Sequence, residues 1–429
     1  MKSITLVSVA CASLALGEPI KSREWEATSG HKTEAIALSA TAATVTLELA
    51  SGKTITLPLD KLVPADREAI LAHFELEPPK VGDPVRSGDA PLSGDGLDYP
   101  VGEIKGNVES APGSHFHIFV PKSLKKDRPA PVLHFNNSGR VQPEELTPYI
   151  SACERFGWIL VGSAESANGL AAGANLGFAT ANIKMLRDNP LVDPERIYFT
   201  GNSGGGAQSW ENCAKLRGAG TMPNIGYIPS SAEVSKGHHF VTGGARDFNR
   251  YHSALSASTF GKNAIYRAFP GGHSGVSDPW ITEEGIAWLT AKYLNKKAKD
   301  SDFAGQRLDF EAAVIDWMAE LSGDKPYLAY HIGKMMQGVY EVSGKNGEII
   351  ALQVVELAKN SANVKFSQGL LAIHELGVKS MGGEADASNI YNRSIPTISR
   401  KATALAEEYA GVEFVEETLK ELSEPTVGK

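Results

Sequence analysis

The stretch Ile197-Tyr-Phe-Thr-Gly-Asn-Ser-Gly-Gly-Gly206 decides the fold class of this chain. Its first half is a short apolar run that predicts a buried strand, and the residues from Ala207 onward predict a helix. The turn between them contains Gly201-Asn-Ser-Gly-Gly205, which matches the G-x-S-x-G pattern of a nucleophile elbow. Glycines on both sides allow a serine to stand on a strained strand-to-helix turn. The sequence therefore predicts that Ser203 is a nucleophile.

The same turn does not match two other glycine-rich connections between a strand and a helix. No Gly-Lys-Ser/Thr follows it, as a phosphate-binding P-loop requires, and the dinucleotide pattern G-x-G-x-x-G is absent. A serine at a helix N-terminus has backbone N–H groups and the positive end of the helix dipole beside any oxyanion that it creates. The turn is therefore typical of acyl chemistry.

Composition narrows the class of protein. With 429 residues, 42% of them hydrophobic and 21% charged, the chain is expected to be globular with more than one domain. The net charge of −8 gives no electrostatic reason to expect nucleic acid as a partner. Residues 1–17 combine a positive start, an apolar core and small residues at the end, and so predict a secretory signal and a secreted or periplasmic protein. No other stretch approaches eighteen apolar residues, so no membrane span is expected.

Cysteine and histidine usage predicts neither a disulfide nor a metal site. Cys11 could carry a lipid, but the segment before it is very short. We expect Cys153 and Cys213 to be free, buried thiols on helices that cover opposite faces of a sheet. His238 and His239 are adjacent on a predicted strand, where side chains point to opposite faces, and no carboxylate or cysteine stands at ligand spacing. No metal and no cofactor are predicted.

Residues 97–297 alternate between predicted strands and helices. This alternation predicts a mostly parallel sheet covered by helices on both faces, and hence an α/β catalytic domain. Helices are also expected after the last two strands. The predicted strands are 115–120, 131–135, 158–161, the run into Ser203, 224–228, 240–242 and 264–269, and the predicted helices between them include 143–156 and 175–187.

Two further regions flank this domain. Residues 18–76 show alternating apolar residues, a hairpin around Ser51-Gly52 and a short helix that starts at Pro64, which together predict a small β domain. The Pro-rich residues 77–96 have linker composition. Residues 298–429 predict an all-α region with helices at 310–321, 327–342, 348–359, 399–408 and 414–422.

A nucleophilic serine needs a histidine to take its proton and an acid to orient that histidine. In a sheet of this type the chain order is serine, acid, histidine, and the acid and histidine lie in loops after late strands. Asp247 and His273 each follow a late predicted strand, and two glycines immediately before His273 would let its imidazole approach Ser203. We therefore expect Ser203, Asp247 and His273 to form a triad, with Asp278 as the alternative acid.

An acyl-transfer site also needs hydrogen-bond donors for an oxyanion. The backbone N–H of Gly204, directly after the nucleophile, is the first expected donor. The second is expected from the loop after strand 131–135, where Asn136 or Asn137 offers a backbone N–H and a side-chain amide. Three further residues are predicted to line the substrate pocket: Ser166, Asn168 and Trp280.

The string Asp193-Pro-Glu-Arg-Ile-Tyr-Phe-Thr-Gly-Asn-Ser203-Gly-Gly resembles the nucleophile region of α/β-hydrolases of the polyhydroxyalkanoate-depolymerase and feruloyl- or acetyl-esterase-like group. Arg155-Phe-Gly-Trp158, Gly-x-x-Asp247 and Pro-Gly-Gly-His273 extend the resemblance. It implies an α/β-hydrolase fold with Ser203 as nucleophile, Asp247 as acid and His273 as base. The chain departs from the group at the oxyanion loop, which reads His-Phe-Asn-Asn-Ser-Gly where relatives commonly have His-Gly-rich strings.

The N-terminal region is similar to another family. Arg23-Glu-Trp25, the Gly-turn hairpin, Leu59-Asp-Lys-Leu62 and Asp66-Arg67 resemble the small homology domain of a yeast endocytic actin-patch adaptor. That family has a barrel like a Src-homology-three domain and recognises Asn-Pro-Phe-x-Asp peptides. The resemblance implies a peptide ligand; the alternative is a small β module that spaces or docks the catalytic domain.

These observations predict a secreted serine hydrolase that cleaves carboxylic esters of carbohydrate or polyester type through an acyl-enzyme. A serine peptidase of the same fold is an alternative, since the triad does not distinguish esters from amides. A second alternative is a non-catalytic adaptor that binds partners through its N-terminal barrel and its helical region.

Overall fold

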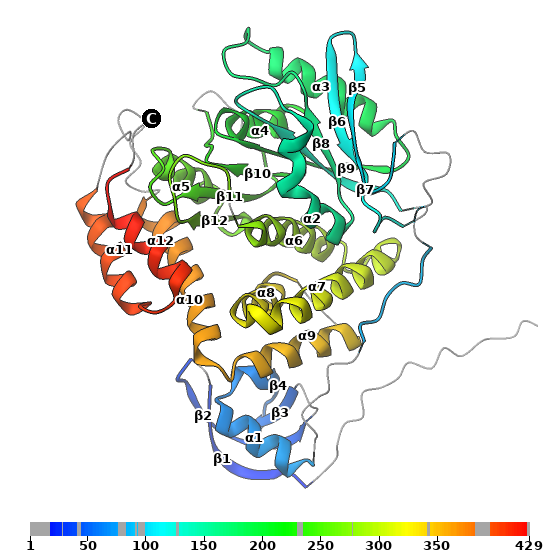
Figure 1. Ribbon diagram of the computed structural model, residues 1–429. Helices are drawn as coiled ribbons and strands as arrows, with labels where there is room; N and C mark the ends of the chain where they lie inside the picture. The colour runs from blue at the N-terminus through cyan, green and yellow to red at the C-terminus, as the bar shows by residue number, and fades with distance from the viewer. Residues whose placement is uncertain are drawn as a thin grey trace, which may run out of the picture. The chain divides into compact units, whose positions relative to one another are not determined.

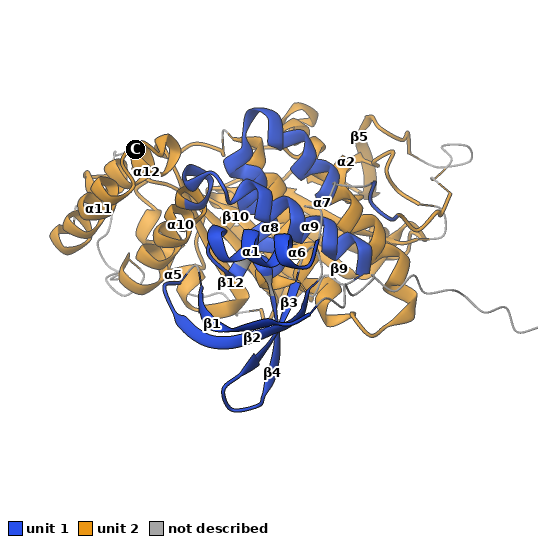
Figure 2. Ribbon diagram, turned by 90° about the horizontal axis from the view of Figure 1, so that it is seen from below, with its two compact units in different colours: residues 1–85, 314–337, 342–364 blue, residues 86–313, 338–341, 365–429 orange. Residues whose placement is uncertain are grey.

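The computed structural model describes residues 18–27, 29–40, 44–75, 83–90, 92, 99–125, 128–229, 235–276, 278–340, 344–381 and 395–426. The predicted signal segment, Cys11 and part of the predicted linker lie outside these ranges. The chain divides into two compact units, coloured in Figure 2. Unit 1 comprises Met1–Val85, Val314–Gln337 and Val342–Val364, and unit 2 comprises Arg86–Ala313, Gly338–Glu341 and Lys365–Lys429. The predicted helical region 298–429 contributes to both units, and the predicted domain boundaries stay predictions.

Within the part of the chain that the structure describes, an eight-stranded sheet forms the centre of unit 2 (Figure 1). Across the sheet the order is β5-β6-β8-β7-β9-β10-β11-β12. Only β6 runs opposite to the rest. This is the arrangement of the α/β-hydrolase fold, as predicted. The strands are β5 (Ile104–Ala111), β6 (Ser114–Phe119), β7 (Ala130–Asn136), β8 (Ile159–Ser163), β9 (Val192–Asn202), β10 (Gly220–Asn224), β11 (His238–Gly244) and β12 (Ala264–Phe269).

Helices cover both faces of this sheet. On β11, His238 contacts Trp288 of α6, and the next residue, His239, contacts Trp210 of α4. Because adjacent strand residues point to opposite faces, α6 and α4 lie on opposite faces. Helix α2 packs beside α6, and α3 packs beside α4. These helices are α2 (Thr147–Phe156), α3 (Ala174–Arg187), α4 (Gly204–Lys215), α5 (Arg250–Ser258) and α6 (Pro279–Lys296).

One predicted strand is wrong. The structure has β10 at Gly220–Asn224 and not at 224–228. Gly220 and Pro223 weaken the sequence signal for a strand, whereas the run after Asn224 is apolar and attracts the prediction. Ile225, however, has a φ of +47°, so the chain leaves the extended conformation there. Strand β5 and helix α10 were not predicted at all.

The C-terminal helices of unit 2 pack against the edge of the sheet. Helix α10 (Ser361–Glu375) lies along the edge strand β12, where Tyr266 N–H donates to His374 Nδ1 (3.1 Å) and the Arg267 guanidinium donates to the Leu370 carbonyl (3.2 Å). Covering an edge strand in this way removes a surface that could pair with another chain. Helices α11 (Pro396–Glu408) and α12 (Glu413–Ser423) pack against each other.

Unit 1 contains a second sheet, which in the described residues has four antiparallel strands in the order β1-β2-β3-β4. The hairpin of β3 and β4 and the helix α1 follow the prediction. Trp25 is buried in the core of this sheet, and its indole N–H donates to the Ala35 carbonyl (2.8 Å). The resemblance to a peptide-binding barrel stays a prediction. The elements are β1 (Ile20–Glu26), β2 (Lys32–Ala40), β3 (Thr44–Leu49), β4 (Thr54–Pro58) and α1 (Pro64–His73).

Unit 1 also includes the end of α7 (Ala304–Asp324), most of α8 (Pro326–Val339) and α9 (Gly344–Leu357). Short 3₁₀ turns are η1 (Leu59–Lys61), η2 (Pro143–Leu146), η3 (Gly261–Asn263) and η4 (Ser301–Phe303), and a π-helical turn, η5 (Leu376–Met381), follows α10. Among the helices of the described ranges, none is long and apolar enough to cross a membrane.

Candidate active site

The turn between β9 and α4 holds Ser203 in a strained backbone conformation. Ser203 is the N-cap of α4 and has φ 54° and ψ −116°, a region that a residue with a Cβ rarely adopts. Its backbone N–H donates to the Asn224 carbonyl at the end of β10 (3.0 Å). A Cβ on Gly205 would collide with the backbone of Asn136 and Asn137, so this position requires glycine. These are the features expected of a nucleophile elbow.

Three side chains predicted as a triad meet at this turn. His273 Nε2 lies 2.8 Å from Ser203 Oγ, and His273 Nδ1 lies 2.9 Å from Asp247 Oδ1. Asp247 is fully buried, whereas the His273 side chain is 23% exposed. The imidazole also stacks on Phe248, with ring centroids 4.1 Å apart. Asp247, and not the alternative Asp278 at the start of α6, is therefore the carboxylate that contacts the histidine.

The Asp247 carboxylate is fixed by its own loop. Asn249 N–H donates to Asp247 Oδ1 (2.8 Å), the same oxygen that faces His273. Such a bond from a residue two positions on is an Asx turn. The carboxylate therefore faces the imidazole Nδ1 in the geometry that would select the tautomer with Nε2 free to take a proton from serine.

Asn136 is the first of the two predicted partners for an oxyanion. It ends β7, and its side chain is fully buried. The amide nitrogen donates to the Thr200 carbonyl (3.4 Å), and the amide oxygen accepts from Asn212 of α4 (3.5 Å). The side chain of Asn136 is thus engaged inside the fold.

Asn137 is the second. Its amide nitrogen donates to Glu145 Oε1 (2.5 Å), and its amide oxygen accepts from Ser138 N–H (2.8 Å), so this side chain is also engaged. Its backbone, by contrast, lies against the first turn of α4, because a Cβ on Gly205 would stand 2.7 Å from Asn137 Cα. The first N–H groups of a helix have no intrahelical acceptor. The backbone of Asn137 therefore lies against the turn that carries Ser203, and Gly204 is the first residue of α4.

The loop after β8 contains two residues predicted for the substrate pocket. Ser166 is buried, and its hydroxyl donates to Gln208 Oε1 on α4 (2.8 Å). Asn168 is exposed, and its backbone N–H donates to the Ser138 carbonyl (2.8 Å). A Cβ on Gly204 would collide with the Asn168 side-chain amide. Asn168 therefore borders the nucleophile turn, whereas Ser166 ties the loop to α4.

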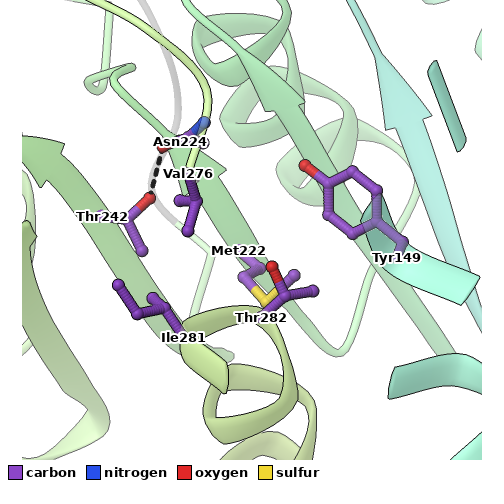
Figure 3. A pocket seen from close by; sticks show the side chains of 7 residues that line it. All are labelled: Tyr149, Met222, Asn224, Thr242, Val276, Ile281 and Thr282. Atoms are coloured by element: carbon purple, nitrogen blue, oxygen red, sulfur yellow. Dashed lines mark hydrogen bonds between the residues drawn. The ribbon is translucent and has the colours of Figure 1, made fainter. Parts of the chain in front are cut away.

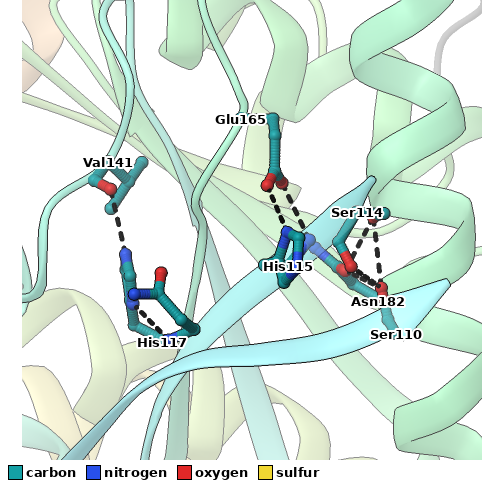
Figure 4. A network of polar contacts seen from close by, with 8 residues as sticks. Ser110, Ser114, His115, His117, Val141, Glu165 and Asn182 are labelled. Atoms are coloured by element: carbon teal, nitrogen blue, oxygen red, sulfur yellow. Dashed lines mark hydrogen bonds and ion pairs between the residues drawn. The ribbon is translucent and has the colours of Figure 1, made fainter. Parts of the chain in front are cut away.

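A polar network anchors the start of the same loop (Figure 4). The Glu165 carboxylate accepts from the His115 backbone N–H (2.8 Å) and faces His115 Nδ1 (2.7 Å). On the neighbouring strand and helix, Ser110 Oγ donates to Asn182 Oδ1 of α3 (2.6 Å). The Glu165 contacts hold the β5–β6 hairpin to the loop that carries Ser166 and Asn168, and the Ser110 contact holds the hairpin to α3.

Trp280, the third residue predicted to line the substrate pocket, packs among aromatic side chains instead. It is largely buried and packs against Phe366 of α10 and Phe414 of α12, with ring centroids 6.2 and 5.3 Å apart. Its surroundings are those of a core side chain at the N-terminal end of α6. The next two residues, Ile281 and Thr282, instead line a small pocket.

Figure 3 shows the side chains that line this pocket, which include Asn224, a residue that also contacts the nucleophile turn. Asn224 joins the two: its carbonyl accepts from Ser203 N–H, its amide nitrogen donates to Asn202 Oδ1 (2.8 Å), and its amide oxygen accepts from Thr242 (2.8 Å). The three triad side chains are not among the residues that line the pocket. The lining residues are Tyr149, Met222, Asn224, Thr242, Val276, Ile281 and Thr282.

Burial raises the pKa of three buried side chains and so disfavours their charged forms. It raises the pKa of Tyr149, at the pocket, to about 12. It raises the pKa of Cys213 to about 12 and that of Cys153 further. Both thiols are free and buried, as predicted. Among the described residues no group of three or more His, Cys, Asp or Glu side chains is placed to hold a metal ion.

Sequence reasoning missed four residues that contact the three triad side chains or the backbone of their loops. Asn249 had a readable signal, since Asp-x-Asn directly after a strand is a common Asx turn. Phe248 and Asn224 had weaker signals, because Phe248 is a single aromatic residue between polar ones and Asn224 ends a strand that was predicted at the wrong residues. Glu421 had none: it accepts from Gly271 N–H (2.5 Å) across 150 residues of sequence.

No protein-family model matches the chain, and no curated protein matches it. Solved structures similar to it include an α/β hydrolase enzyme from the metagenome of Lake Arreo, Spain, at 15% identity over 51% of this chain and 83% of that one (TM-score 0.34). Esterase 2 of Thermogutta terrifontis is 15% identical over 45% of this chain and 93% of its own length (TM-score 0.35). Est1E from Butyrivibrio proteoclasticus is 13% identical over 42% of this chain and 96% of its own length (TM-score 0.35). The fold assignment rests on the strand order given above.

Proposed function

We propose that this chain is a serine hydrolase that cleaves carboxylic esters through an acyl-enzyme. The observation that carries the proposal is the continuous contact from Asp247 Oδ1 through His273 to Ser203 Oγ, with separations of 2.9 and 2.8 Å. Both distances are within hydrogen-bond reach, as proton transfer from the serine requires. The strained serine turn and the closeness of the Asn137 backbone to the first turn of α4 support the same chemistry.

In the acylation step His273 Nε2 takes the proton of Ser203 Oγ while the oxygen attacks the ester carbonyl carbon. The negative charge that develops on the carbonyl oxygen is stabilised by the backbone N–H groups of Gly204 and Asn137. Asp247 accepts the His273 Nδ1–H and stabilises the imidazolium. His273 then gives its proton to the leaving alkoxide oxygen, and the alcohol departs.

Deacylation reverses these roles with water as the nucleophile. His273 Nε2 takes a proton from water, the resulting hydroxide oxygen attacks the acyl carbon, and the proton returns to Ser203 Oγ as the acid is released. Each cycle consumes one ester and one water and needs no other reactant. The partial exposure of the His273 side chain supports access of water and substrate from solvent.

The preference for esters rests on the resemblance of the segment around Ser203 to esterase-like α/β-hydrolases. A carbohydrate- or polyester-type ester is the substrate class that this resemblance favours. The signal-like pattern of residues 1–17 supports secretion of the enzyme.

Hydrolysis of p-nitrophenyl acetate and of the matching p-nitroanilide tests the proposal. We expect the purified wild-type chain to cleave the ester, and Ser203→Ala and His273→Ala to lower kcat by about 10⁶-fold while retaining the wild-type circular dichroism spectrum. Cleavage of the anilide at a comparable rate would favour the peptidase. No cleavage of either by a folded wild-type chain would contradict a hydrolase acting on simple substrates.

A further inference from the structure

The loop that carries His273 is held by the C-terminal helix α12. The Gly271 backbone N–H, two residues before the histidine, donates to the Glu421 carboxylate (2.5 Å). Gly271 has a φ of +121°, a conformation that residues with a side chain rarely adopt. An acceptor on this N–H therefore fixes a peptide that the local sequence leaves free to rotate.

The loop that carries Asp247 is held by the same part of the chain. Arg250 is fully buried, and its guanidinium donates to the Ala245 carbonyl (2.5 Å) and to the Glu424 carbonyl (2.7 Å). It also reaches the Glu421 carbonyl (3.4 Å). Arg246, beside the acid, pairs with the Glu424 carboxylate (3.4 Å). Residues 421–424 thus contact both loops.

The two loops are also joined to each other. Arg246 N–H donates to the Gly271 carbonyl (2.8 Å). Both backbone polar groups of Gly271 therefore have partners: its carbonyl contacts the loop that carries Asp247, and its N–H contacts α12. The aromatic contacts of Trp280 with Phe414 fix α12 against the start of α6. The C-terminal helix is therefore built into the wall behind the acid and the base.

We propose that α12 is a positioning element of the catalytic centre and that Glu421 is its main positioning residue. By fixing the Gly271 peptide, its carboxylate sets the position of the His273 imidazole relative to Ser203 Oγ. Glu421 does not touch the reacting atoms and acts through the loop. This inference rests on the proposed function. It concerns the acylation rate and not substrate affinity, because a displacement of about 1 Å at a reacting group costs up to about 100-fold in rate.

Three variants on α12 separate positioning from simple packing. Glu421→Ala removes the acceptor, Glu421→Gln keeps an acceptor oxygen at the same position without the charge, and Glu417→Ala removes an exposed carboxylate from the same helix as a control. We expect Glu421→Ala to lower kcat for p-nitrophenyl acetate by about 10–100-fold with little change in KM. Glu421→Gln should recover most of that loss, and Glu417→Ala should match the wild type.

A wild-type kcat in Glu421→Ala would overturn the inference, and so would a folded Glu421→Gln as slow as the alanine variant. Amide hydrogen exchange at Gly271 in the wild-type protein tests the contact without any variant: protection is expected, and exchange as fast as in an open loop would overturn it. A wild-type chain that cleaves no ester would contradict the proposed function, while the Gly271 exchange would still report on the contact.

Discussion

The turn that carries Ser203 and the loop that carries His273 are held in different ways. The serine turn is held by the sheet around it: the strand before it, the helix after it, the Asn224 carbonyl on β10 and the end of β7, whose backbone lies against Gly205. The histidine loop also has a distant contact, from Gly271 to Glu421, 150 residues farther along the chain. The turn of the proposed nucleophile is therefore recognisable from the local sequence, whereas the loop of the proposed base makes a contact that the local sequence does not indicate.

This difference determines what could be predicted. The G-x-S-x-G match and the chain order of serine, acid and histidine were sufficient to predict all three side chains that meet in the site. Periodicity was sufficient for the alternating core of unit 2, although a strand with glycine and proline, β10, was misplaced by its apolar neighbours. Nothing near Gly271 indicates that its N–H is bound by α12. Trp280 was misassigned because a tryptophan has the same sequence signal in a cleft as in a core.

The largest expected effect tests the acid. Asp247→Asn should lower kcat by on the order of 10⁴-fold, because an amide that donates toward Nδ1 favours the wrong imidazole tautomer. Asp278→Asn, at the N-terminus of α6, is the matched control and should retain nearly the wild-type rate. Ester hydrolysis by the two purified variants measures this difference. A slower rate in Asp278→Asn than in Asp247→Asn would mean that Asp278 is the acid, and it would contradict the role proposed for Asp247.

A smaller effect tests how local the serine turn is. Gly205→Ala places a methyl group against the backbone of Asn136 and Asn137, and we expect it to cost about 1–3 kcal/mol in the free energy of unfolding and to lower kcat by about 100-fold. Gly177→Ala on α3 meets no atom within 4 Å and should be neutral or slightly stabilising. Urea unfolding and ester hydrolysis measure both. A neutral Gly205→Ala would show that the turn is less tightly packed than the structure indicates.

The smallest expected effect concerns the helix that covers the sheet edge near the histidine loop. Burial and the Arg267 charge lower the pKa of His374 to about 4 from its ordinary value of 6.5. As pH falls, the unfolded chain binds this proton first, so stability is complete above about pH 6.5 and decreases between about pH 6.5 and 4. Buried His134, His238 and His239 act in the same direction, because burial also lowers each pKa.

His374→Gln removes one titrating group while leaving an oxygen that can accept from Tyr266 N–H. The decrease in the free energy of unfolding between pH 7 and pH 4 should then be smaller than in the wild type, by at most about 3 kcal/mol. Denaturant unfolding at both pH values measures the difference. An identical pH dependence in the two proteins would show that His374 does not remain neutral in the folded chain.

The most direct test of the central claim is covalent labelling of the wild-type chain with a fluorophosphonate, followed by mass spectrometry of its peptides. An activated serine attacks phosphorus and forms a stable adduct, whereas an ordinary serine hydroxyl is a poor nucleophile. We expect one adduct, on the peptide that contains Ser203, and its loss in His273→Ala. A folded wild-type chain without an adduct, or with its adduct on another serine, would contradict it.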